Sequence, residues 1–218
     1  MNIEISEAPI TAVVELALVP IAFKVDRVLD LAGQDNGGGG IVLSERGLDV
    51  PYVKDYDAIN CEGPTQWAKR FDVSKWGLIR AHSNGSLVGG AVVAFNSADV
   101  IMLEGCEDLA ALWDIRVSPE VRRQGIGARL FHAAEVWATA RGCRQLKVET
   151  QNINVAACRF YAQQGCVLGG IQRLAYPELP DEIQLLWYKD LATTDPQNLR
   201  PANMRLHPSA VRIVSGRG

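Results

Sequence analysis

The residues with the clearest chemical character lie in one short stretch, which reads Arg-Arg-Gln-Gly-Ile-Gly at positions 122–127. A predicted strand at 112–117 precedes it, and Ser118 and Pro119 open a turn between the two. Free N–H groups and the positive dipole at the start of a helix attract phosphate, and glycine allows close approach to the backbone. The arginines add two charges. The stretch predicts a phosphate cradle, and a solvated turn is the alternative.

A helix must follow this stretch to supply those N–H groups. Arg141 suits the negative end of such a helix, and Gly142 can adopt the left-handed conformation that ends it. Spacings of four and three predict one apolar stripe, formed by Ile126, Leu130, Ala133, Trp137 and Ala140. The glycines at 125 and 127 therefore lie in the first turn of an amphipathic helix.

The other elements follow from periodicity and turn residues. Asn84 and Gly85 predict a tight turn between strands at 77–80 and 87–95. Residues 1–31 are predicted to form one or two strands, and residues 34–40, with four glycines at 37–40, a mobile loop. The remaining predicted elements are strands at 41–43, 109–117, 145–150, 166–175 and 183–188, a helix at 154–164, and a loop with a short helix at 96–108. This order predicts a mixed sheet with helices on both faces.

Composition excludes several classes of function. The 218 residues carry 22 basic and 25 acidic side chains, a net charge of −3, which predicts no affinity for nucleic acid or anionic membranes. The most apolar run, residues 13–23, is too short to span a bilayer, and residues 1–10 do not resemble a secretory signal. Five cysteines and three histidines show no spacing for a disulfide framework or a metal. We expect a cytoplasmic protein without a metal.

Two blocks resemble the GNAT superfamily of N-acetyltransferases. The stretch at 122–127 resembles its R/Q-x-x-G-x-G/A loop, which binds the pyrophosphate of acetyl-CoA. The second block, Glu-Thr-Gln-Asn at 149–152 with Asn154 and Tyr161, resembles the next strand and helix of the superfamily. With residues 168–171, this half is most similar to the streptothricin acetyltransferases. The resemblance is good over 77–189, weak before 77 and absent from the C-terminal tail.

The resemblance implies an α/β (α+β) GNAT fold with a central mixed sheet in one domain at 1–190, and a flexible tail at 191–218. Within that domain, loops and helices at 33–76 would face the acceptor. The resemblance also implies that acetyl-CoA is the cosubstrate. Its expected binding residues are Ile115 and Val117 on the central strand, Arg122, Arg123, Gln124, Gly125, Ile126 and Gly127 in the cradle, and Asn154.

Tyr161 occupies the position of the superfamily's general acid, a phenol that can protonate the departing thiolate; a packed helix tyrosine is the alternative. The general base is less defined, because Trp113 stands where streptothricin acetyltransferases have an acidic residue. Asp114 and Glu149 are the main candidates and Glu104 is another, with surface or ion-pair roles as the alternative for each.

The expected acceptor is the primary amine of a small cationic molecule, with a streptothricin-type antibiotic as the specific expectation. Acidic and aromatic residues between 45 and 76 suit a cation, and we expect Asp55, Asp57 and Trp113 to contact it, although a polar surface loop is equally compatible. The alternatives are a protein or peptide amine as acceptor, and a CoA-binding sensor without turnover. A homodimer is compatible with the sequence.

Overall fold

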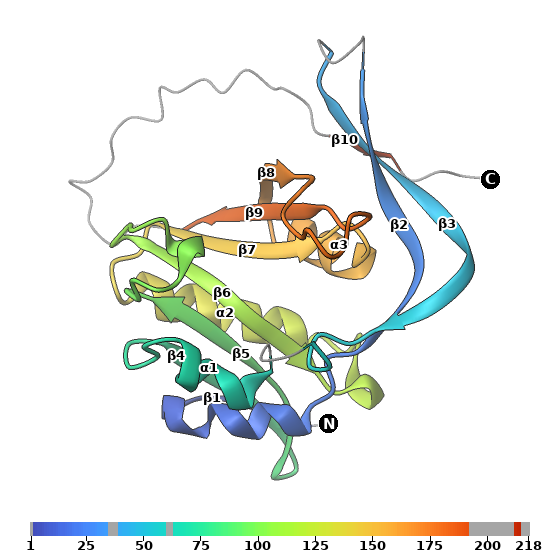
Figure 1. Cartoon of the computed structure of the whole chain (residues 1–218). Helices are drawn as coiled ribbons and strands as arrows, with labels where there is room; N and C mark the ends of the chain where they lie inside the picture. Colours follow the sequence, from blue (N-terminus) through green and yellow to red (C-terminus); the bar gives the residue numbers. More distant parts are fainter. Residues whose placement is uncertain (1, 35–38, 60–62, 192–211, 215–218) are drawn as a thin grey trace. The chain divides into compact units, whose positions relative to one another are not determined.

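The computed structural model describes residues 2–34, 39–59, 63–191 and 212–214. The chain divides into two compact units, and Figure 1 shows it coloured along the sequence. Of the described residues, unit 1 contains 2–23, 54–59, 63–148 and 188–191, and unit 2 contains 24–34, 39–53, 149–187 and 212–214.

Unit 1 is built on strands in the order β1-β4-β5-β6-β7. Their bounds are β1 (Ile3–Ala8), β4 (Gly77–Ser83), β5 (Ser86–Phe95), β6 (Leu109–Val117) and β7 (Gln145–Gln151), whose last three residues belong to unit 2. The first three pairs are antiparallel and β6–β7 is parallel, so the sheet is mixed as predicted. Asn84 and Gly85 join β4 to β5 with φ of 49° and 82°, which confirms the predicted hairpin turn.

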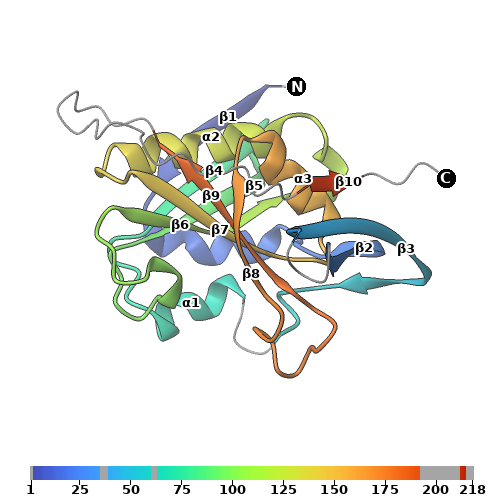
Figure 2. The same cartoon turned by 90° about the horizontal axis from the view of Figure 1, so that it is seen from above.

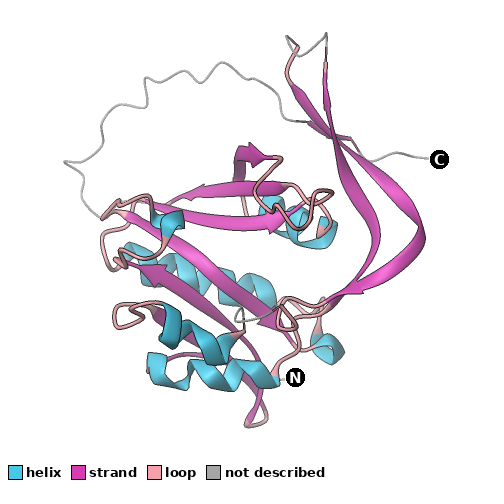
Figure 3. Cartoon of the chain, in the orientation of Figure 1, coloured by secondary structure: helices cyan, strands magenta, loops and turns pink. Residues whose placement is uncertain are grey.

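Helices cover both faces of the sheet in unit 1 (Figure 3). A Cβ on Gly89 of β5 would lie 3.3 Å from Leu130 of α2 (Ile126–Thr139). A Cβ on the next residue, Gly90, would lie 2.5 Å from Leu16 of the 3₁₀ helix η1 (Ile10–Leu18). Because successive strand residues point to opposite faces, α2 and η1 lie on opposite sides of the sheet, as Figure 2 shows. The predicted arrangement of helices is confirmed.

The buried stripe of α2 differs from the predicted one. Ala133 is only half-buried and Ala140 is exposed, while Phe131 is 1% exposed. The buried residues are Ile126, Leu130, Phe131, Ala134, Trp137 and Ala138. The sequence spacing identified the helix correctly but assigned Ala133 and Ala140 to its buried face. The helix instead buries Phe131, because this side chain removes far more apolar surface from water than either alanine does. The end of the helix is as predicted, since Arg141 donates to the Trp137 carbonyl at 3.2 Å and Gly142 has φ of 79°.

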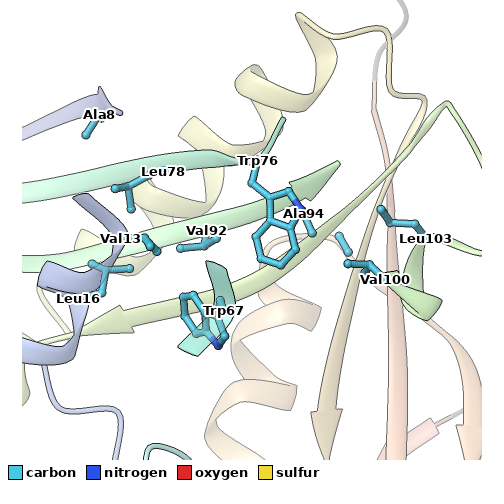
Figure 4. Packing of buried hydrophobic residues seen from close by; sticks show 11 residues of the cluster. Ala8, Val13, Leu16, Trp67, Trp76, Leu78, Val92, Ala94, Val100 and Leu103 are labelled. Carbon is cyan, nitrogen blue, oxygen red and sulfur yellow. The ribbon is translucent and has the colours of Figure 1, made fainter. Parts of the chain in front are cut away.

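A hydrophobic cluster fills the η1 side of unit 1 (Figure 4). Leu16 of η1, Trp67 of α1 (Pro64–Arg70) and Trp76 lie in it beside the strand residues Leu78 and Val92. Val100 and Leu103, the latter in η3 (Ile101–Leu103), extend it along the loop before β6. The cluster fixes η1 and α1 on the sheet, because all of these side chains are at most 5% exposed.

Unit 2 contains the strands β2 (Phe23–Gly33), β3 (Ile41–Lys54), β8 (Val167–Gln172) and β9 (Gln184–Asp190), and the helix α3 (Val155–Gln163). Asn152 donates to the Leu29 carbonyl at 3.1 Å and accepts from the Ile183 amide at 2.8 Å. The buried Glu45 carboxylate accepts from Arg27 and Arg159. These bonds connect the β2 and β3 strands to the end of β7 and to α3.

Some predicted boundaries were wrong. Between the two strands in residues 1–31, Ile10–Leu18 forms η1, because its apolar residues pack on the sheet as a helix. The short strand predicted at 41–43 continues to Lys54 as β3. Residues 35–38 of the predicted glycine loop lie outside the described residues. So does most of the predicted tail, of which Arg212–Val214 form β10, paired in parallel with β3.

Candidate active site

The predicted phosphate cradle is an open turn at the start of α2. Arg123 and Gly125 both have left-handed backbone conformations, with φ of 62° and 80°. Gly125 is the N-cap of α2 and makes no side-chain cap, and the Arg129 amide is the first to bond back, to the Gly125 carbonyl at 3.1 Å. The N–H groups of the first helical turn therefore point out of the helix without intrahelical acceptors. Such a turn can hold an anion by its backbone.

The two arginines of the cradle have different environments. Arg122 is half-buried, and its guanidinium donates to the carbonyls of Val117 at 2.9 Å, Pro20 at 3.2 Å and Ala22 at 3.3 Å. Arg122 therefore connects the turn to the end of β6 and to the segment after η1. Arg123 is exposed, as are Gln124 and Gly125. Their exposure leaves this side of the turn accessible to a ligand from solvent.

The central strand β6 is irregular where it approaches the cradle. Its register with β5 pairs Val92 with Asp114 and Val93 with Leu112, so Trp113 is an extra residue in a β-bulge. The parallel pairing of β6 with β7 runs only from Leu109 to Leu112. Ile115 and Val117, both half-buried, lie beyond the last of these pairs. Their backbone is where the resemblance to the superfamily implies contacts to the pantetheine arm of acetyl-CoA.

Two buried side chains of β6, Asp114 and Arg116, form a charged cluster with the half-buried Asp57. The Arg116 guanidinium, 1% exposed, donates to both oxygens of Asp114 at 2.8 and 2.7 Å and to both oxygens of Asp57 at 2.7 and 3.2 Å. It also donates to the carbonyl of Val19 at 3.1 Å. Burial opposes its charge, but the hydrogen bonds and charges of the two carboxylates outweigh burial and raise the pKa of Arg116. Arg116 stays protonated and holds both acids.

This cluster changes the interpretation of two predicted site residues. Asp114 was a candidate base and Asp57 a candidate acceptor ligand, but the oxygens of both are bound by Arg116. Arg116 was not singled out from the sequence. The signal was present, since charged residues at 114 and 116 alternate within an otherwise apolar strand, a spacing that places both on one face.

Asp55 and Trp113 are the other predicted acceptor residues. Asp55 is exposed, and its carboxylate accepts from the Asp57 amide at 3.0 Å, which shapes the turn after β3. Trp113 is half-buried and packs edge-on against Phe71, with ring centroids 5.0 Å apart, and at 5.2 Å from Trp76. Trp113 therefore belongs to an aromatic cluster beside the hydrophobic core, with part of its surface still accessible.

In unit 2, α3 carries the predicted acid and the predicted cofactor-contacting asparagine. Asn154 is the N-cap of α3, and its side chain accepts from the Ala157 amide at 3.1 Å. Tyr161 is 5% exposed and its ring lies 5.2 Å from that of Phe160. The sequence spacing of seven places them two helical turns apart.

Glu149, the other candidate base, forms a phenol–carboxylate pair. It accepts a hydrogen bond from Tyr176, whose hydroxyl lies 2.5 Å from Oε1. The same hydroxyl accepts from the Gln151 amide at 2.9 Å. Burial, followed by the charge of Glu149 and this hydrogen bond, raises the pKa of Tyr176. Tyr176 was missed in the sequence analysis, because it is 27 residues from Glu149 and no local pattern joins them.

Glu104, the third candidate base, is paired with a buried lysine. Its carboxylate lies 2.5 Å from Nζ of Lys147, whose side chain is 4% exposed. The lysine also lies over the Tyr188 ring, 5.5 Å from its centroid. Glu104 is thus the counter-ion of a buried charge, which is a structural role.

Within the described ranges there is no group of three or more histidine, cysteine or acidic residues that could hold a metal. In the same part of the chain, no helix is both long and apolar enough to cross a membrane.

Comparison with known families identifies the class of protein. Residues 51–166, more than half of the chain, match the Acetyltransferase (GNAT) family. The chain therefore belongs to the GNAT acetyltransferase family, and its mixed sheet with helices is the GNAT fold.

Particular relatives are antibiotic acetyltransferases. Streptothricin acetyltransferase A of Bacillus subtilis (strain 168) is 37% identical over 81 residues, which cover 36% of this chain and 47% of that protein. Streptothricin acetyltransferase of Streptomyces lavendulae is 27% identical over 65% of this chain and 71% of its own length. Aminoglycoside N(6')-acetyltransferase type 1 of Klebsiella aerogenes is 39% identical over 40% and 57%. The chain spans about half the length of the first two streptothricin acetyltransferases that it matches, those of Bacillus subtilis and Escherichia coli.

Solved structures of other proteins share this fold. A protein of Bacillus anthracis str. Ames described as a streptothricin acetyltransferase, with acetyl coenzyme A bound, is 26% identical. The similarity covers 88% of this chain and 100% of that one, with a TM-score of 0.67. The crystal structure of nourseothricin acetyltransferase, 22% identical, has the same fold with a TM-score of 0.68.

Proposed function

We propose that this protein transfers an acetyl group from acetyl-CoA to a primary amine of a small cationic molecule, with a streptothricin-type antibiotic as the first candidate acceptor. The observation that carries the proposal is the open turn at 123–125 before α2, whose first N–H groups have no acceptor within the helix. The turn suits a pyrophosphate, because it offers several N–H donors and the positive end of a helix dipole.

The cradle residues have separate roles in this proposal. Gly125 and Gly127 allow the pyrophosphate to approach the backbone, and the exposed Arg123 supplies charge. Arg122 holds the turn through its three carbonyl bonds rather than reaching for phosphate. The backbone of Ile115 and Val117, beyond the last β6–β7 pair, binds the pantetheine arm.

Three side chains of unit 2 have roles in this proposal, two in proton transfer and one in contacting the cosubstrate. Tyr161 is the acid for the leaving thiolate, as its position in the family pattern implies, and Asn154 contacts the cosubstrate in addition to its capping role. Glu149 is the better candidate for the carboxylate that receives the acceptor amine. Asp114 is less suited, because both of its oxygens are bound to the permanently charged Arg116.

Release of the CoA thiol from acetyl-CoA tests the proposal directly. Purified protein is offered streptothricin, an aminoglycoside, a polyamine and a peptide amine in turn. We expect turnover with streptothricin. The aminoglycoside is included because the Klebsiella aerogenes relative is named an aminoglycoside N(6')-acetyltransferase. Turnover with the peptide alone would instead favour a protein or peptide acetyltransferase. Acetyl-CoA binding without turnover on any amine would contradict the proposed activity and favour a sensor.

The variant Gly125→Val tests the cradle. A β-branched residue at φ of 80° is strained, and its side chain covers the N–H groups of the turn. We expect acetyl-CoA affinity, measured by calorimetry, to fall by more than about 10-fold. Gly105→Val is the matched control, because Gly105 also has a positive φ, of 69°, in open space but lies before β6. Equal affinity for acetyl-CoA in both variants would contradict the assignment of the turn at 123–125 as the pyrophosphate site.

A further inference from the structure

Tyr176 lies in the segment between β8 and β9 and reaches Glu149 on β7. Glu149 and Gln151 are two residues apart on this strand, so their side chains are on the same face of it. The Tyr176 hydroxyl bonds to both of them, at 2.5 Å from Glu149 Oε1 and 2.9 Å from Gln151 Nε2. The three polar groups thus form a short chain of hydrogen bonds within unit 2.

The direction of this chain is fixed by its donors. The amide nitrogen of Gln151 can only donate, so the phenol oxygen accepts from it. The one hydroxyl proton of Tyr176 is then directed to Glu149, which acts as the acceptor. A hydrogen bond to an ionised carboxylate is roughly twice as strong as one between neutral groups. This bond restricts the rotation of the Glu149 side chain and engages Oε1.

The second carboxylate oxygen is placed differently. Among the residues that the structure describes, Oε2 of Glu149 has no hydrogen-bond partner. An ionised carboxylate has about four acceptor positions. Glu149 therefore retains capacity to accept from the N–H groups of an ammonium, or from a water molecule that takes the proton of that ammonium. One oxygen is therefore held by the phenol, while the other remains available for a cationic amine.

We infer that Tyr176 is a positioning residue for the acceptor step, acting through Glu149, with side-chain hydrogen bonds from Gln151 and Gln184 to its hydroxyl directing its proton to the carboxylate. The inference rests on the proposed acetyl transfer to an amine. In it, the Tyr176 phenol orients the Glu149 carboxylate toward the acceptor nitrogen and takes no part in binding acetyl-CoA.

Steady-state kinetics of Tyr176→Phe, Glu149→Gln and the double variant test this role. Tyr176→Phe keeps the ring and removes the hydroxyl. We expect it to lower kcat/KM for the acceptor by about 10- to 100-fold, the range for a hydrogen bond to a charged group. The dissociation constant of acetyl-CoA should stay at the wild-type value. The double variant should be no worse than Glu149→Gln alone, because the phenol acts only through the carboxylate. Tyr188→Phe, which removes a phenol elsewhere, is the control.

The outcomes separate this inference from the proposed function. Wild-type turnover with an unchanged Tyr176→Phe, or single effects that multiply in the double variant, would overturn the role of Tyr176 and leave the acetyltransferase activity standing. A wild type that turns over no amine would remove both. If Tyr176→Phe does not fold, Gln151→Leu takes its place. Loss of the amide donor should lower kcat/KM for the acceptor. The same substitution should have no further effect on kcat/KM when Glu149→Gln is already present.

Discussion

At the scale of single residues, most polar side chains near the predicted site have a structural partner, and this separates candidate roles. Arg116 binds the oxygens of Asp114 and Asp57, and Lys147 binds Glu104. These acids are the counter-ions of buried cations. Glu149 differs, because its carboxylate accepts a hydrogen bond from the Tyr176 phenol rather than from a buried cation. We therefore keep Glu149 as the proposed base, and Tyr161 remains the proposed acid on the family pattern alone.

The variant Tyr161→Phe tests the acid role. If the phenol protonates the departing thiolate, its removal should lower kcat by about 100-fold or more. The dissociation constant of acetyl-CoA should remain close to wild type, because the ring and the α3 packing are kept. Stopped-flow or steady-state thiol release measures the first and calorimetry the second. Tyr188→Phe is the control, since the Tyr188 ring lies against the Lys147 ammonium, 5.5 Å from its centroid. An unchanged kcat would assign Tyr161 to packing alone.

At the scale of elements, three glycines allow helices to pack closely on the strands. A Cβ on Gly77 of β4 would lie 2.3 Å from Cε2 of Trp137 on α2. Trp137 cannot shift easily, because its indole donates to Glu7 at 2.9 Å and the Arg141 guanidinium stacks on its ring at 3.6 Å. Together with Gly89 and Gly90, Gly77 sets how near α2 and η1 approach the sheet.

The variant Gly77→Ala should therefore destabilise the protein. The added methyl overlaps the indole, and overpacking of this kind costs about 1–3 kcal/mol. Urea unfolding monitored by circular dichroism measures the loss. Gly47→Ala on β3 is the matched control, because its Cβ would meet nothing within 4 Å, and we expect its free energy of unfolding to stay the same or rise slightly. If both variants unfold alike, the close packing of Trp137 on β4 is not a determinant of stability.

At the scale of the whole molecule, buried acids that stay protonated make the fold sensitive to alkali. Burial raises the pKa of the Cys143 and Cys158 thiols from 9.0 to about 11. Burial first, and then the charge of Glu149, raises that of Tyr176. Each group has a higher pKa folded than unfolded. Its contribution to stability is complete below the unfolded pKa and is lost as the pH rises through the folded pKa.

The free energy of unfolding should accordingly fall between pH 9 and 11, by an amount measured in urea titrations at pH 7.5, 9, 10 and 10.5. The double variant Cys143→Ala with Cys158→Ala lacks both buried thiols, so its loss of stability over this range should be smaller than that of the wild type. Cys106→Ala is the control, because this thiol is exposed. Parallel curves for wild type and the double variant would contradict the role of the thiols.

The sequence alone determined the features that local patterns encode. The Asn-Gly turn fixed the β4–β5 hairpin, the 3.6-residue period fixed α2, and the Arg-Gly stretch predicted a glycine-containing turn at the start of that helix. Only the tertiary structure decided what each charge does. It joined Arg116 to Asp57, 59 residues away, and Tyr176 to Glu149, 27 residues away. Such partners are brought together by packing, and no spacing in the sequence records a contact between residues that meet only in the folded chain.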